Sequence, residues 1–364
     1  MGQDFTTGGG GRAPDSYARQ LPDGRWECLI CPRGCRLRAG QRGFCFVRAA
    51  DEHGLRLTTY GRSSGFCIDP IEKKPLYHFL PGTPVLSFGT AGCNLSCSFC
   101  QNWDISHARE FERLSAVAAP ERIAEAAAGH GCRSVAFTYN DPAIFSEYAI
   151  ATALACRARQ IATVAVTAGA IQGQARQDLF SVMDAANVDL KAFSDGFYRK
   201  LCGIPLASVL DTLRYLAHDT TVHLEITTLL IPGLNDSDHE LRQLCSFVRD
   251  ELGPEVPQHF SAFHPSGRMR NTEATPPATL HRARDIAREM GLHYVYVGNI
   301  QDPDATTTWC PACGTAVIER DWYEICSWRL HAGRCRHCHS PIAGRFEEHP
   351  GDWGRKRLPI SIEG

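Results

Sequence analysis

From about residue 84 onward, short apolar runs alternate with longer amphipathic stretches. Each run is rich in β-branched or aromatic residues and is bounded by Gly, Pro, Asn or Asp, which is typical of buried strands. The runs are VLSFG (85–89), SVAFTY (134–139), ATVAVT (162–167), VDLKAF (188–193), HLEITTLLI (223–231), HFSAF (259–263) and YVYVG (294–298).

Helical segments with recognisable ends lie between these runs. Asp141-Pro142 opens a helix that we expect to reach about Arg159; a second is predicted over 236–252, and a third begins at 275–277 and ends at Gly291. Strand and helix alternate about six times, which favours parallel strands and a barrel-like α/β sheet, a partial (β/α)6 TIM-like barrel. We assign this core to residues 78–304. In such sheets the chemistry gathers at the carboxyl ends of the strands.

The segments on either side of this core differ from it in composition and in hydrophobic pattern. Residues 1–24 are rich in Gly and polar residues and are predicted to be a disordered leader. Residues 25–77 form a Cys-rich, loop-like segment without a sustained hydrophobic period. Residues 305–346 form a second Cys-rich module, and 347–364 are expected to be a tail.

Charge and hydropathy exclude several classes of partner. The chain is 43% hydrophobic and 21% charged, with a formal net charge of −2. A broad attraction to nucleic acid or to an anionic membrane is therefore not expected. No apolar run reaches the roughly 18 residues of a membrane helix, and the first residues lack a signal-peptide core. We therefore expect a cytoplasmic protein.

Seventeen cysteines are the most unusual feature of the composition. In a reducing compartment cysteines serve as metal ligands more often than as disulfides. Eleven of them fall into three groups, at 28/31/35/45, at 93/97/100 and at 310/313/335/338. The scattered remainder are interpreted as small buried hydrophobic residues; they are Cys67, Cys132, Cys156, Cys202, Cys245 and Cys326.

The central group lies in one loop directly after the first predicted strand. Cys93, Cys97 and Cys100 are spaced tightly enough to bind three corners of an iron–sulfur cubane. No fourth cysteine follows nearby, so one iron would be free to bind a small molecule. The alternatives are a zinc knuckle with His107 as a candidate fourth ligand, although zinc prefers a closed site of four ligands, or three cysteines in a structural loop.

Asp189 and Lys191 form a charged pair inside an otherwise apolar predicted strand. Residues two apart on a strand project from the same face, and buried charges are costly without a partner. A polar ligand inside the barrel would satisfy both. The alternative is that they form an ion pair with each other.

The two flanking cysteine groups predict further metal sites. Cys310-x2-Cys313 and Cys335-x2-Cys338 are separated by a possible hairpin (317–330), which is the pattern of a tetrahedral zinc ribbon. Rubredoxin-like iron would show the same spacing. The other group implies one metal centre that is either zinc or an auxiliary iron–sulfur cluster; its ligands would be Cys28, Cys31, Cys35 and Cys45.

The central motif resembles a known family. C-x3-C-x2-C with Phe99 before the last cysteine resembles the signature of the radical S-adenosylmethionine (SAM) superfamily. The surrounding GTAGCNLSCSFCQNWDIS is similar to the branch related to pyruvate formate-lyase-activating enzyme, and more narrowly to the AmmeMemoRadiSam-system radical SAM enzymes. The resemblance extends from about Trp26 to about Phe346.

This resemblance implies an activity. A 4Fe–4S cluster with one open iron would bind SAM and cleave it reductively to methionine and a 5′-deoxyadenosyl radical, which abstracts hydrogen from a protein or small-molecule substrate. The electron would come from a low-potential donor such as flavodoxin or ferredoxin. The resemblance also implies Memo-like and AMMECR-like proteins as substrates or companions.

The resemblance further assigns contacts to SAM. Tyr139, Asn140 and Asp141 stand in the place of the superfamily's Gly-Gly-Glu motif, although Asp141 is equally suited to cap the following helix. His264 matches a histidine that contacts SAM in the activating enzymes, and Asp189 and Lys191 lie at a further strand end. Two other functions remain open: a non-catalytic iron–sulfur or zinc adaptor, and methyl or aminocarboxypropyl transfer from SAM.

Overall fold

The computed structural model describes residues 11–107 and 116–362. Its centre is a nine-stranded sheet in the order β15-β14-β13-β12-β11-β10-β8-β7-β21. Seven of these strands are parallel and follow one another in chain order. They are β8 (Pro84–Phe88), β10 (Ser134–Phe137), β11 (Ala162–Thr167), β12 (Ala185–Asp189), β13 (His223–Leu230), β14 (Gln258–Ala262) and β15 (Val295–Gly298).

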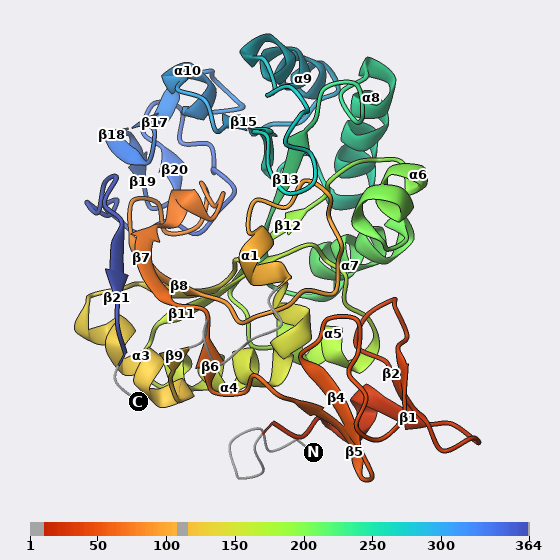
Figure 1. Cartoon of the computed structure of the whole chain (residues 1–364). Coiled ribbons are helices and arrows are strands. Elements are labelled where there is room, and N and C mark those ends of the chain that lie inside the picture. Colours follow the sequence, from red (N-terminus) through yellow and green to blue (C-terminus); the bar gives the residue numbers. More distant parts are fainter. Residues whose placement is uncertain (1–10, 108–115, 363–364) are drawn as a thin grey trace.

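Six consecutive connections join these seven strands, which confirms the predicted repeat. Figure 1 shows the helices along the outside of the curved sheet, with α1 near its centre in this view. The longer helices are α3 (Pro120–Gly129), α4 (Ser146–Arg157), α5 (Gly173–Phe180), α7 (Leu206–Asp219), α8 (Asp238–Phe247) and α9 (Pro277–Glu289). The short helices are α1 (Trp103–Ser106), α6 (Asp195–Phe197) and α10 (Pro303–Thr306).

The predicted helices form, and their ends are irregular. The first begins as a 3-10 turn (Pro142–Phe145) before α4. The second continues from α8 into a π-helical turn (Val248–Leu252), which stops at Gly253 with φ of 111°. The Ser237 side chain accepts a hydrogen bond from the Glu240 backbone N–H and so satisfies an end group that the helix itself leaves unpaired. A second π-helical turn (Tyr198–Cys202) follows α6.

The sheet buries both of its faces. The face toward the helices carries large side chains such as Phe88 and Phe137, whose ring centroids lie 5.5 Å apart. The inner face is filled near the amino ends of the strands by a segment that includes Leu76 and Phe79, which pack on Val85 and its neighbours. This inner plug therefore fills the barrel interior at the amino ends of the strands.

A buried polar network fixes the plug to the amino ends of the strands. The Glu225 carboxylate accepts hydrogen bonds from the backbone N–H groups of Tyr77 (3.0 Å) and His78 (2.7 Å), and its oxygens lie 3.0 and 2.7 Å from the ring Nε2 atoms of His223 and His259. The His78 ring contacts the Ala343 carbonyl and the Tyr296 hydroxyl, each at 2.5 Å. The network therefore connects barrel, plug and C-terminal module.

The N-terminal module consists of short antiparallel pairs. β1 (Ala18–Gln20), β2 (Trp26–Cys28) and β3 (Arg36–Leu37) form one sheet, and β4 (Arg48–Asp51) pairs with β5 (Gly54–Leu57). β6 (Arg62–Ser63) pairs with β9 (Ala116–Val117). β7 (Phe66–Pro70) adds to the edge of β8 in antiparallel orientation, so the central sheet begins before the predicted boundary at residue 78.

The disordered leader predicted over residues 1–24 is wrong from residue 11 on. A 3-10 turn at Asp15–Tyr17 leads into β1, which pairs with β2. Tyr17 is fully buried and belongs to the hydrophobic core. The stretch is polar on average, so its composition gives no sign that this one aromatic ring anchors it. Residues 1–10 lie outside the described residues.

The C-terminal module is a small β-structure that packs on the amino end of the barrel. Its strands are β16 (Thr308–Trp309), β17 (Ala316–Asp321), β18 (Glu324–Trp328), β19 (Leu330–His331) and β20 (Arg334–Cys335). β17 and β18 form the predicted hairpin. The expected tail contains β21 (Leu358–Ile360), which pairs with β7 and completes the central sheet. Within the described residues no helix has the length and apolarity required to cross a membrane.

Candidate active site and metal centres

The loop that carries Cys93, Cys97 and Cys100 follows β8 at the carboxyl end of the sheet. Its backbone is held from two sides. Ser96 N–H donates to the Cys202 carbonyl at 2.9 Å, and the Ser98 carbonyl accepts from Arg268 N–H at 2.7 Å. A Cβ at Gly267 would lie 2.6 Å from the Ser98 carbonyl oxygen, so this contact requires glycine. The protein therefore fixes the loop through main-chain contacts.

The three thiols lie in a protein-lined environment that favours their neutral form. Burial raises the pKa of Cys93 and of Cys100. Contact with the Cys202 thiol, together with burial, raises the pKa of Cys97. A coordinating metal reverses this preference, because a metal-bound thiol is deprotonated.

Cys202 is a neighbour that the sequence analysis missed. It is fully buried, and it ends the π-helical turn that supports the cysteine loop. From the sequence it is one of six scattered cysteines interpreted as buried hydrophobic residues, and no sequence signal connects it with a loop more than a hundred residues earlier.

Asp189 and Lys191 meet beside the cysteine loop, as an ion pair with Nζ and Oδ2 2.7 Å apart. The strand predicted over 188–193 lies three residues earlier at its start, since β12 runs from Ala185 to Asp189 and Lys191 lies in the following loop. Lys191 Nζ is 5.9 Å from the centroid of the Phe99 ring, within the cysteine loop. Burial alone would lower the pKa of Lys191, but the Asp189 carboxylate and the nearby thiols hold it well above its ordinary value. The pair therefore presents a charged amine to the cysteine loop.

Asp141 is occupied by contacts within the protein. Its Oδ1 accepts from Ala143 N–H and from the Thr167 hydroxyl, and its Oδ2 accepts from Ala168 N–H, all at 3.0 Å. The residue thus caps the following helix, as one of the two sequence hypotheses proposed, and connects the ends of β10 and β11.

Tyr139 and Asn140 support the cysteine loop. The Asn140 side chain accepts from Thr90 N–H at 3.1 Å and donates to the Gly92 carbonyl at 2.8 Å. The Tyr139 carbonyl accepts from the Asn102 side chain at 2.9 Å. The structure therefore gives these residues a positioning role, and their contact with SAM stays a prediction.

His264 follows β14 and is exposed. The segment that it begins reaches the cysteine loop through Ser266, whose hydroxyl donates to the Phe99 carbonyl at 3.2 Å. The structure thus brings His264 to the same end of the sheet as the other predicted site residues.

Four buried polar atoms on the inner face have no hydrogen-bond partner among the described residues. They are Ser87 Oγ, Ser134 Oγ, Asn187 Oδ1 and Thr227 Oγ1. Ser134 begins β10 and lies opposite Val85 at the amino end of the sheet. Ser87 lies two residues after Val85 in β8, and Asn187 lies two residues before Asp189 in β12, so the side chains of each pair share a face of the sheet. Buried polar groups are usually satisfied, and Ser87, Asn187 and Thr227 indicate that the barrel interior suits a polar ligand. Nothing in the sequence singles these residues out, because serine, threonine and asparagine are common in strands.

The four C-terminal cysteines are arranged for a single ion. Their Sγ atoms all lie within 4.8 Å of one another; the group is Cys310, Cys313, Cys335 and Cys338. Cys310 and Cys338 are 3.6 Å apart, and Cys313 and Cys335 are 3.8 Å apart. Tetrahedral zinc with Zn–S bonds of about 2.3 Å separates its sulfur ligands by about 3.8 Å. Hydrogen bonds from Ser340 lower the pKa of Cys338 to about 6, which assists metal binding.

The N-terminal cysteines line one cavity beside the central loop. The cavity wall includes Arg33, Arg48, Asn94 and the four thiols of Cys28, Cys31, Cys35 and Cys45. Among the described residues, no three of these four thiols approach within 4.8 Å of one another as the C-terminal thiols do. The same holds for Cys93, Cys97 and Cys100.

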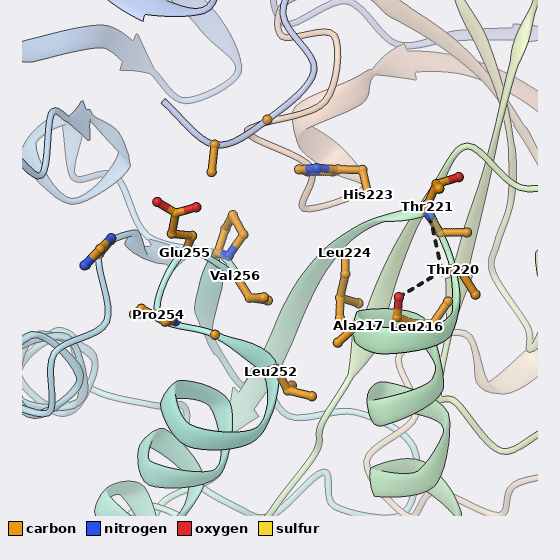
Figure 2. A pocket seen from close by; sticks show the side chains of 16 residues that line it. Leu216, Ala217, Thr220, Thr221, His223, Leu224, Leu252, Pro254, Glu255 and Val256 are labelled. Atoms are coloured by element: carbon orange, nitrogen blue, oxygen red, sulfur yellow. Dashed lines mark hydrogen bonds between the residues drawn. The ribbon is translucent and has the colours of Figure 1, made fainter. Parts of the chain in front are cut away.

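A larger pocket lies at the opposite end of the barrel. Figure 2 shows it between the end of α7 and the turn after the π-helical segment, with His223 and Glu255 entering from different elements. Most of its other lining residues are apolar or contribute backbone. Because it is remote from the carboxyl ends of the strands and gathers no cluster of reactive groups, we do not assign the chemistry to it.

Residues 88–245 match the family described as the radical SAM superfamily. An uncharacterized protein of Methanocaldococcus jannaschii, MJ0808, is 38% identical over 328 residues, which cover 90% of this chain and 97% of that protein. The isethionate sulfite-lyase activating enzyme of Desulfovibrio desulfuricans is 25% identical over 132 residues, 36% of this chain and 41% of that enzyme.

Among solved structures, a domain of pyruvate-formate lyase-activating enzyme from Bacteroides vulgatus is similar, with a TM-score of 0.41 and 17% identity. The match covers 46% of this chain and 99% of that domain. The superfamily match begins at the last residue of β8, includes the loop of three cysteines and β10 to β13, and ends within α8, before β14 and β15. Residues 88–245 therefore carry a radical SAM domain, and over almost its whole length the chain belongs with MJ0808 in one family.

Proposed function

We propose that this protein is a radical SAM enzyme whose 4Fe–4S cluster is held by Cys93, Cys97 and Cys100. The observation that carries the proposal is the position of these three thiols. They lie in one loop at the carboxyl end of a parallel sheet, with an ion pair beside them and, deeper in the barrel, polar atoms that lack a partner among the described residues. A structural zinc loop requires neither of these features.

The residues present fit the cluster and SAM. A cubane exposes its irons at separate corners, so its thiolate ligands stand farther apart than the ligands of one ion; among the described residues the three thiols of this loop are not all within 4.8 Å of one another. When bound, the reduced cluster supplies the electron that cleaves SAM to methionine and a 5′-deoxyadenosyl radical. The loop backbone, held by Cys202 and Arg268, positions the three ligands.

Lys191 and Asp189 orient SAM in this proposal. The amine of Lys191 suits the carboxylate of the methionine part, and the Asp189 carboxylate, about one-third exposed, suits the ribose hydroxyls. Ser87, Asn187 and Thr227 offer further hydrogen-bonding atoms deeper in the barrel. The plug below them excludes water, which protects a radical from side reactions.

The test is anaerobic reconstitution, reduction and addition of SAM, with 5′-deoxyadenosine and methionine as the measured products. Cys97→Ala is expected to form neither product. Cys202→Ala is the matched control, because it removes the thiol beside Cys97 and leaves the supporting backbone. We expect it to retain the cluster and the products. Loss of iron in Cys202→Ala would mean that four side chains fill the cluster, and the proposal would then fail.

The product also separates the other candidate functions. Methylthioadenosine in place of 5′-deoxyadenosine would indicate methyl or aminocarboxypropyl transfer. No product above the Cys97→Ala level would leave a non-catalytic adaptor.

The substrate, the electron donor and the partners extend the proposal. We propose a low-potential donor such as flavodoxin or ferredoxin, membership of the AmmeMemoRadiSam group, and Memo-like and AMMECR-like proteins as substrates or companions. One relative is named an activating enzyme, so a backbone glycine of a protein is one class of hydrogen donor to examine. Deuterium transfer into 5′-deoxyadenosine, with each labelled partner added in turn, identifies the substrate.

A further inference from the structure

The four cysteines of the N-terminal module surround a cavity instead of meeting at a point. Cys28 ends β2, Cys31 and Cys35 lie in the turn that follows, and Cys45 precedes β4. All four line the same cavity. No three of their Sγ atoms come within 4.8 Å of one another in the described part of the chain, whereas the C-terminal thiols do. One structure therefore contains two four-thiol sets, and only one of them has the spacing of a single ion.

Two arginines point to an anionic occupant of this cavity. Arg48 is only 2% exposed; although it pairs with Glu147, its Nε has no partner among the described residues. Arg33 donates from Nε to the Asn94 carbonyl, and its buried Nη2 has no partner there either. Buried guanidinium N–H groups are costly to leave unpaired. Sulfur atoms of an anionic cluster would accept hydrogen bonds from both.

This cavity adjoins the loop of the first cluster. Asn94, which follows Cys93, forms part of its wall. A Cβ at Gly92 would lie 2.1 Å from the Cys45 carbonyl oxygen, so the two backbones touch. With standard backbone dimensions, that contact places the Cα atoms of Cys45 and Cys93 no more than about 10 Å apart.

We propose that Cys28, Cys31, Cys35 and Cys45 bind a second 4Fe–4S cluster, with all four corners occupied by thiolate, which passes single electrons to the first cluster. A low-potential one-electron donor reduces the second cluster from the 2+ to the 1+ state. The second cluster returns to 2+ as the first becomes 1+, so the electrons balance. The site follows from the thiols and arginines alone; the use of its electron rests on the proposed function.

The first experiment measures metal content. In a Cys93→Ala/Cys97→Ala/Cys100→Ala variant reconstituted without oxygen, we expect about four iron and four sulfide per chain to remain, together with about one zinc. Adding Cys35→Ala should remove the iron and leave the zinc, which reports that the C-terminal module is still folded. Adding Cys326→Ala is the matched control; this exposed cysteine belongs to none of the three groups, and the iron should stay.

The second experiment uses the unmodified protein. Reduced protein should give two electron paramagnetic resonance components, of which SAM changes only the one from the cluster with an open iron. Absence of the SAM-insensitive component, or about two zinc and no iron in the triple variant, would overturn the second cluster. Absence of the SAM-sensitive component would instead contradict the proposed function, so the two failures are distinguishable.

Discussion

The Glu225 carboxylate and the Lys191–Asp189 ion pair lie at opposite ends of the parallel barrel, and their charged groups are satisfied in different ways. At the amino end, both oxygens of the Glu225 carboxylate are satisfied by protein donors. At the carboxyl end, the Lys191–Asp189 pair is partly exposed, and polar atoms such as Thr227 Oγ1 lack partners among the described residues. The first arrangement stabilises the fold, and the second leaves capacity for a ligand. The predictions below test this division, from the largest expected effect to the smallest.

Glu225→Gln should destabilise the protein most. Each oxygen of Glu225 accepts from two donors, so an amide in either orientation turns its NH2 toward two N–H groups. We expect the free energy of unfolding, measured in urea, to fall by about 3–5 kcal/mol. Iron content and 5′-deoxyadenosine formation per folded molecule should be retained. Glu255→Gln, an exposed change nearby, should shift stability by less than about 0.5 kcal/mol. Lost activity with unchanged stability in Glu225→Gln would contradict the assignment of Glu225 to stability and of the carboxyl end to chemistry.

Lys191→Met should act on chemistry instead. Its partner Asp189 is about one-third exposed and stays solvated, so stability should change by less than about 1 kcal/mol. The rate of 5′-deoxyadenosine formation should fall about 100-fold or more, the usual cost of removing one positioned charge. Iron content measures cluster retention. Lys73→Met is the control, since Lys73 also forms a partly exposed ion pair, with Asp69. Equal loss in both variants would disprove a role for Lys191.

Asp141→Asn tests the two roles predicted for Asp141, which are capping the following helix and contacting SAM. An amide keeps the bonds at one oxygen and loses the one from Ala168 N–H, so we expect a loss of about 1–2 kcal/mol in stability. SAM affinity, measured by isothermal titration, should stay unchanged if the residue only caps the helix. Thr167→Val removes a single bond to the same carboxylate and should give a smaller loss. Weakened SAM binding in Asp141→Asn alone would restore the predicted cofactor contact.

The burial of His78 predicts that the free energy of unfolding depends slightly on pH. Burial lowers its pKa to about 3 from an ordinary 6.5, so the unfolded chain takes up a proton below pH 6.5 that the folded protein excludes. Stability is therefore complete above about pH 6.5 and decreases as pH falls toward 3.

The measurement for His78 is a difference between two proteins. Between pH 7.5 and 5.5 the wild type should lose about 1.4 kcal/mol relative to His78→Gln. Burial also raises the pKa of Glu72 to about 7, but Glu72 titrates in both proteins and cancels in the comparison. A constant stability gap across this range would mean that the folded state protonates His78.

Periodicity and spacing predicted the parts of this molecule that depend on local chemistry. The seven parallel strands, the helix after Asp141 and the β17–β18 hairpin between the C-terminal knuckles all follow from such patterns. What failed depends on contacts between distant segments. Tyr17 is buried by a module that composition describes as loop, and Cys202 reaches Cys97 only through tertiary packing. Glu225 had a visible signal, a lone carboxylate in an apolar run. Its partners include His223 of the same strand, but the others come from distant segments, at residues 77–78 and at His259.

The position of β21 has a consequence for biogenesis. The chain is synthesised from its N-terminus, so β7 is made long before its partner β21. One edge of β7 therefore has unpaired backbone N–H and C=O groups until residues 358–360 have been synthesised. An open edge strand invites pairing with another nascent chain. The pairing of residues 358–360 with β7 therefore protects this edge from contacts between chains.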